Sequence, residues 1–114
     1  MKGDLAPETK SWLVDEAEKI LNRVKDERDF RGQTAQLRNL VQIAQSESEV
    51  PVLRNFIRYQ TGRKSTKKFW SLIHAGVLRM LEDIGKAFPD VDKRRKAIQS
   101  FFGYLVRHYV YLTA

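Results

Sequence analysis

Cysteine is absent from the 114-residue chain, which excludes disulfide bridges, thiolate metal ligands and cysteine nucleophiles. No stretch approaches the roughly 18 uncharged apolar residues that a membrane-spanning helix requires. Residues 1–10 also lack the apolar core of a signal peptide. These absences predict a cytoplasmic protein that has no membrane partner.

Acidic residues are missing between Glu49 and Glu82, although this part of the chain holds seven cations. Since seven of the 21 Lys and Arg lie here, the remaining 14 equal the 14 Asp and Glu found elsewhere. The whole formal charge of +7 is therefore concentrated in residues 50–81, the acid-free segment. A localised positive field of this kind favours an anionic polymer or surface as a partner.

Strand patterns are lacking too, because no segment alternates apolar and polar residues between turn signals. Helical spacing, proline and glycine instead predict five helices. They run from Pro7 to about Asp29, from Thr34 to the connector at 46–49, from Pro51 to Gly62, from about Ser65 to Ala87, and from Asp90 or Asp92 almost to Ala114. Gly62 is expected to close the third helix in a left-handed conformation. The sequence thus predicts an all-α protein, a compact five-helix bundle in a single domain over residues 1–114.

Motifs that carry catalytic chemistry are scarce. His74 and His108 are the only histidines, and neither has a second type of ligand at metal-binding spacing. Acid pairs occur at helix ends or in the connector, where capping explains them. The chain has no glycine-rich phosphate loop and no HExxH motif. We therefore expect a protein that is not an enzyme and uses no metal or cofactor.

Cations of the acid-free segment gather around the predicted turn between the third and fourth helices. They occupy one face of the third helix, the turn itself and the first turn of the fourth helix: Arg54, Arg58, Arg63, Lys64, Lys67 and Lys68. Backbone amides at a helix start favour anions, and arginine and lysine both bind phosphate. The predicted ligand is a polynucleotide backbone, contacted without regard to base sequence.

Aromatic residues accompany these cations and return near the end of the chain. Tyr59 is open to stack on a single-stranded base, whereas Phe69 and Trp70 are expected in the core. The stretch "FFGYLVRHYVYL" at 101–112 holds too many aromatic residues to bury on one helical stripe. Aromatic surface left outside predicts a partner, for which further copies of the same chain are a common choice. A weaker basic stretch, "KRRK" at 93–96, is offset by neighbouring acids.

Three stretches together resemble the small α-helical subunit of type III-A CRISPR–Cas effector complexes, the Csm complexes. They are "TAQLRNL" at 34–40, "LRNFIRYQTGRK" at 53–64 and "FFGYLVRHYVYL" at 101–112. The resemblance covers residues 34–112, whereas residues 1–33 match little beyond being helical. Departures lie at Arg58 and Gln60, where smaller residues are usual, and at 107–109, where the closing Tyr-His-Lys pattern is permuted. The type III-B small subunit is similar in architecture.

The resemblance implies a function in antiviral defence. Such subunits stack in several copies along the crRNA-bearing backbone filament, contact the backbone and large subunits, and help form the groove where target RNA pairs with the guide. They do not cut RNA. Positions that match the family are Arg38, Arg58, Arg63 and Lys64, while Arg54, Lys67 and Lys68 follow from the residue pattern alone.

Two other classes of function remain compatible with the sequence. Helices two and three could form a helix-turn-helix regulator, which would prefer duplex DNA and bind as a dimer with fixed half-site spacing. Alternatively, the basic patch could dock an acidic protein in a purely structural role, with no retention of nucleic acid.

Overall fold

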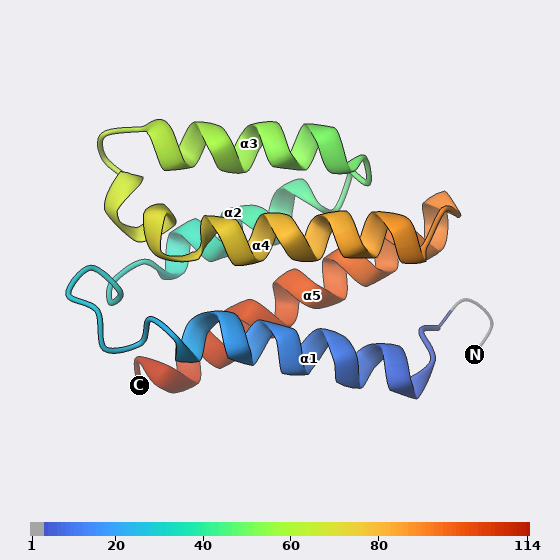
Figure 1. The fold of residues 1–114 in the computed structure, drawn as a ribbon, viewed down its shortest axis with the longest axis horizontal. Coiled ribbons are helices and arrows are strands. Elements are labelled where there is room, and N and C mark those ends of the chain that lie inside the picture. The colour runs from blue at the N-terminus through green and yellow to red at the C-terminus, as the bar shows by residue number, and fades with distance from the viewer. Residues whose placement is uncertain (1–3) are drawn as a thin grey trace.

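Five helices and their connections make up residues 4–114, the part of the chain that the computed structural model describes. The helices are α1 (Pro7–Asn22), α2 (Thr34–Ile43), α3 (Val50–Gly62), α4 (Lys67–Ala87) and α5 (Val91–Leu112). They form an all-α single-domain bundle of 42 × 27 × 20 Å, as the sequence predicted, and no strand occurs in the described part (Figure 1). No helix within residues 4–114 is long and apolar enough to cross a membrane.

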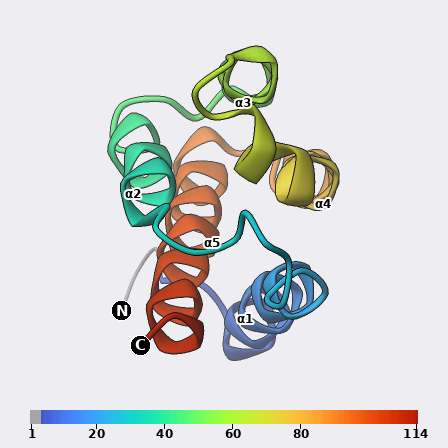
Figure 2. The same ribbon diagram turned by 90° about the vertical axis from the view of Figure 1, so that its left-hand side faces the viewer.

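Helix α5 lies at the centre, and α1, α2 and α4 pack around it (Figure 2). Helix α3 packs on α4, so that the two form an antiparallel hairpin on the outside of the bundle (Figure 1). Each helix buries an apolar stripe in one shared core, which is the usual reason that such helices associate. The largest fully buried side chains are Trp70, Tyr109, Phe30, Phe69, Phe101 and Phe102.

The predicted end of the first helix at Asp29 is wrong, because α1 stops at Asn22. Residues 23–33 form the α1–α2 loop, a series of turns that includes backbone bonds from Val24 to Leu21 and from Glu27 to Val24. The charged residues after Val24 offer no further apolar stripe to pack. Phe30, by contrast, is 1% exposed in the core, and this burial fixes the loop in a non-helical path. Gly32, near the end of this loop, has a φ of 81°, a left-handed conformation that glycine adopts without strain.

Gly62 does not adopt the predicted left-handed conformation. Among the described residues the only positive φ belongs to Gly32. Helix α3 is instead followed by Arg63 as its C-cap, whose φ of −73° and ψ of 132° are extended, and whose N–H donates to the Tyr59 carbonyl. The sharp change of direction needs no left-handed residue, because four residues remain to complete the turn before α4 starts at Lys67 rather than at Ser65.

The opposite end of the hairpin is held by Arg94, a member of the "KRRK" stretch. Its side chain is buried and donates from Nε to the Ser48 carbonyl at 2.9 Å. Nη1 donates to the carbonyls of Phe88 at 3.3 Å and Pro89 at 2.9 Å, and Nη2 lies 3.2 Å from Glu49 Oε2. Arg94 therefore joins the α2–α3 and α4–α5 connections and is not available to a ligand. The same turn confirms the predicted cap, since Asp90 accepts a hydrogen bond from the Lys93 N–H at 2.9 Å.

Candidate nucleic-acid interface

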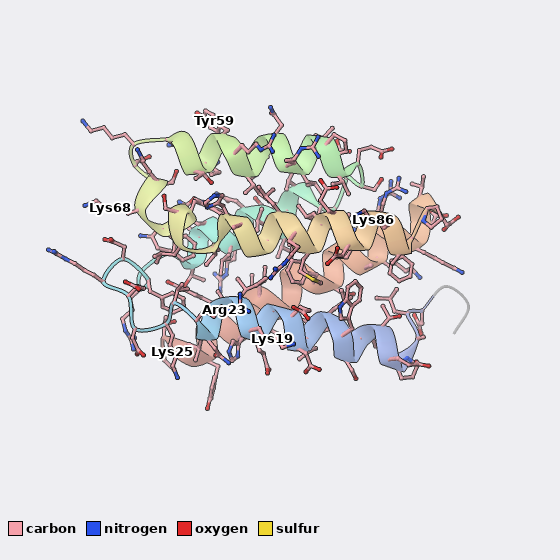
Figure 3. All side chains as sticks on the ribbon, in the orientation of Figure 1. Lys19, Arg23, Lys25, Tyr59, Lys68 and Lys86 are labelled. Atoms are coloured by element: carbon pink, nitrogen blue, oxygen red, sulfur yellow. The ribbon has the colours of Figure 1, made fainter. Side chains whose placement is uncertain are left out.

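Five of the predicted cations lie exposed on the α3–α4 hairpin. Arg58 projects from α3, Arg63 and Lys64 lie in the turn, and Lys67 and Lys68 open α4. Within residues 4–114, none of the five side chains forms a hydrogen bond or an ion pair. We call these five side chains the hairpin basic surface. Figure 3 shows Lys68 at the turn, at the same end of the bundle as Lys25 of the α1–α2 loop.

The start of α4 adds backbone donors to this surface. No side chain caps its first turn, and that turn contains no acid. Thr66, the N-cap residue, points its hydroxyl back toward α3 and donates to the Gln60 carbonyl at 2.6 Å. The helix start therefore keeps its positive dipole end uncompensated beside Lys67 and Lys68.

Arg54 does not belong to this surface. Its Nη1 atom lies 2.8 Å from Oε1 of Glu82, which projects from the adjacent helix α4. Glu82 stands just beyond the acid-free segment in sequence, but the antiparallel hairpin brings it next to Arg54. Arg54, which the residue pattern grouped with the predicted phosphate-binding cations, is therefore paired with a carboxylate within the fold.

Arg38 lies elsewhere as well. It lines an apolar groove between α2 and α5, together with Val41, Gly103, Val106 and Arg107. Next to this groove along α5, Tyr104 and Tyr111 line a second hollow with Val14 and Glu18 of α1. Tyr111 is 75% exposed, so aromatic surface does remain outside the core, as the sequence predicted. The structure thus separates a basic hairpin from a mixed aromatic and cationic face on α5.

Aromatic residues of the hairpin divide as predicted. Phe69 and Trp70 are buried, while Tyr59 is 61% exposed and points away from the other helices (Figure 3). The Arg63 guanidinium lies 5.8 Å from the centre of the Tyr59 ring, within the range of a cation–π contact. Tyr59 is therefore the one aromatic side chain of the acid-free segment that is well placed to meet a base. His74 is a boundary histidine, its Nδ1 lying 3.1 Å from the Trp70 carbonyl.

Two further cations, Arg28 and Arg31, come close to the hairpin through the α1–α2 loop, which was not predicted from the sequence. Phe30 stands between them and packs on Phe69, with ring centres 6.4 Å apart, and on Tyr109 at 4.9 Å. The Tyr109 hydroxyl donates to the Phe30 carbonyl and accepts from the Gln33 N–H at 2.9 Å. The loop is thus anchored in the core on both sides of Arg31. The only sequence signal was an aromatic residue inside a charged run.

Tyr109 should give the fold a specific sensitivity to alkaline pH. Burial raises the pKa of its phenol above the ordinary value of 10.0. Between pH 10.0 and that raised pKa the unfolded chain loses the phenol proton while the folded chain keeps it, so stability falls as pH rises. We expect Tyr109→Phe to cost about 1–3 kcal/mol at neutral pH, because the Gln33 N–H loses its acceptor. The variant should lack the fall in unfolding free energy that ionisation of Tyr109 causes above pH 10.0. If the unfolding free energies of both proteins fall in parallel above this pH, Tyr109 is not the group responsible.

Comparison of the chain with protein-family models, with curated proteins and with solved structures gave no match.

Proposed function

We propose that the chain is a non-catalytic RNA-binding subunit that holds single-stranded target RNA through its phosphates. The observation that carries the proposal is the hairpin basic surface, five exposed cations whose side chains form no hydrogen bond or ion pair within residues 4–114. Exposed lysines and arginines at protein surfaces are commonly solvated without a ligand. Here three lysines and two arginines border an uncapped helix start, which adds oriented amides. Arginine and lysine mixed in this way suit a phosphate backbone.

The sequence resemblance supports a more specific setting for this activity. We propose that the chain acts in the cytoplasm as the small subunit of a type III-A CRISPR–Cas effector complex, in antiviral defence. In that setting the hairpin basic surface contacts target RNA paired with the crRNA. The face of α5 that carries Tyr104 and Tyr111 is the proposed contact with further copies of the chain and with the backbone and large subunits.

The helix-turn-helix alternative has less support from the packing. A helix-turn-helix places its second helix against the first across a short turn. Here α2 packs on α5 and α3 packs on α4. The connection between α2 and α3 is also held by Arg94 through the Ser48 carbonyl. This packing supports the RNA-binding proposal over a DNA-reading pair of helices.

Salt dependence of RNA binding tests the proposal. If the hairpin basic surface neutralises about four phosphates, log K for a single strand should fall against log salt with a slope near −3. Fluorescence anisotropy with oligonucleotides of equal length and different sequence gives the slope and the sequence preference in one series. Similar affinity for all sequences is expected, because phosphate contacts carry no base information.

Three outcomes would count against the proposal. An affinity that does not change with salt would exclude phosphate contacts as the main source of binding. A clear preference for duplex DNA of one sequence would favour the helix-turn-helix regulator. No retention of any nucleic acid would favour a structural role in which the basic surface docks an acidic protein.

A further inference from the structure

The α1–α2 loop and the α3–α4 turn lie at the same end of the bundle (Figure 2). Residues of both segments line a cleft. Its lining combines four cations from these two segments with one carboxylate: Arg28, Arg31, Lys64, Lys68 and Asp29. The cleft has a volume of about 200 Å³, compared with roughly 30 Å³ for one water in the liquid. We call it the end cleft.

Charge in the end cleft is largely free to act on a ligand. Within residues 4–114, Arg28, Lys64 and Lys68 form no hydrogen bond or ion pair. Arg31 uses one nitrogen, Nη1, on the Thr113 carbonyl at 3.2 Å, which leaves most of its donors unused. One carboxylate among four cations leaves a net positive cleft.

The two cationic walls are held in place by the core beneath them. Phe30 of the loop and Phe69 of α4 are both 1% exposed and pack on each other and on Tyr109. Each carries a cation as its chain neighbour, Arg31 after Phe30 and Lys68 before Phe69. Keeping like charges at a fixed separation is unfavourable unless an anion lies between them. A rigid support under the repelling side chains therefore points to a bound anion.

We propose that the end cleft is a phosphate-binding subsite, in which arginines of the α1–α2 loop and lysines of the α3–α4 turn hold the same phosphate group. The inference rests on the proposed RNA-binding function and extends it, because it assigns a contact to a loop outside the region that resembles a known family. Arginine supplies a planar fork of donors and lysine a point charge, and the two together surround a tetrahedral anion.

The chain offers a matched pair of variants for the test. Arg28→Gln with Arg31→Gln removes two charges from the end cleft. Arg23→Gln with Lys25→Gln removes two charges from exposed residues of the same loop that do not line the cleft (Figure 3). Both variants lose the same net charge from the same loop. A difference in RNA affinity between them therefore reports the contribution of the end cleft. Circular dichroism and thermal unfolding check that both variants fold.

Binding of single-stranded RNA is measured against salt for the wild type and both variants. We expect the slope of log K against log salt to become shallower by about 0.7 for the cleft variant relative to the loop control, because the contact with one phosphate is lost. Equal slopes would overturn the inference and leave the hairpin proposal intact. Oligonucleotides with a 5′-phosphate or a 5′-hydroxyl identify the source: an effect in both points to a backbone phosphate, and an effect confined to the first points to a terminal phosphate.

Titration with inorganic phosphate tests the cleft independently of RNA. In amide NMR spectra we expect saturable shifts in residues 28–31 and 64–69 of the wild type and of the loop control, and their loss in the cleft variant. If RNA fails to bind while these shifts persist, the proposed function fails and the phosphate subsite stands. Shifts that are absent from the wild type, or unchanged in the cleft variant, would overturn the subsite.

Discussion

Reversal of charge at Arg58 and Arg63 should weaken RNA binding on the order of 100-fold at 0.1 M salt. Loss of each phosphate contact lowers log K by about 0.7 at this salt concentration. Replacement by glutamate adds repulsion between the new carboxylates and the phosphates. Both side chains are exposed and form no ion pair within residues 4–114, so the fold should be little affected. The loss should be the same for every RNA sequence, as measured by anisotropy with several oligonucleotides.

The control for this double variant is reversal at Lys10 and Lys86, which changes the net charge equally. Lys10 is exposed near the start of α1, and Lys86 lies in the last turn of α4, roughly 28 Å along that helix from Lys67 (Figure 3). If position matters, this control should lose much less affinity than the hairpin variant. Equal losses of affinity in both variants would mean that only the net charge matters. A loss of affinity for one RNA sequence alone would indicate base recognition.

Replacement of Arg94 by alanine should cost about 3–5 kcal/mol of unfolding free energy, because each buried carbonyl left without a donor costs about 1–3 kcal/mol. The carbonyls of Ser48, Phe88 and Pro89 would all lose their donor. For a domain of this size the melting temperature should fall by roughly 15 °C, as measured by circular dichroism or calorimetry. RNA binding of the folded fraction should be retained, because Arg94 is buried at the far end of the hairpin from the turn.

Glu49→Gln is the matched control for Arg94. The Glu49 side chain is 58% exposed, and the amide oxygen of glutamine still accepts a hydrogen bond from the guanidinium. A cost below about 1 kcal/mol is expected for loss of such an exposed ion pair. The cost of Arg94→Lys should fall between those of the alanine and glutamine variants. An ammonium group is a point charge, and it cannot reach all three carbonyls as the planar fork of arginine does. An alanine variant as stable as the wild type would show that the three carbonyls do not depend on Arg94.

Most of the helical layout was predictable, because it depends on local signals. Proline at the starts of α1 and α3 and the Asp90 cap of α5 act within one turn of their own position. The end of α1 was mispredicted because the competing force was not local. Phe30 leaves the helical path for a core position beside Tyr109, 79 residues further along the chain.

Part of the candidate interface was predictable for the same reason. The order Arg63, Lys64, Lys67 and Lys68 around a turn is a local pattern, and the structure places all four exposed at that turn. Arg54 was misjudged because its partner Glu82 lies 28 residues away and meets it only through hairpin packing. Arg28 and Arg31 were missed because the sequence contains no sign that the α1–α2 loop returns to the α3–α4 turn.

The sequence by itself determined five amphipathic helices and the concentration of the whole net charge in one segment without acids. Only the tertiary structure decided which of those cations are paired, which are left exposed without an ion pair and which others join them. The physical reason is range. Helix formation and local charge are fixed by neighbours in the chain, whereas pairing of charges across helices depends on distances that exist only once the core has packed.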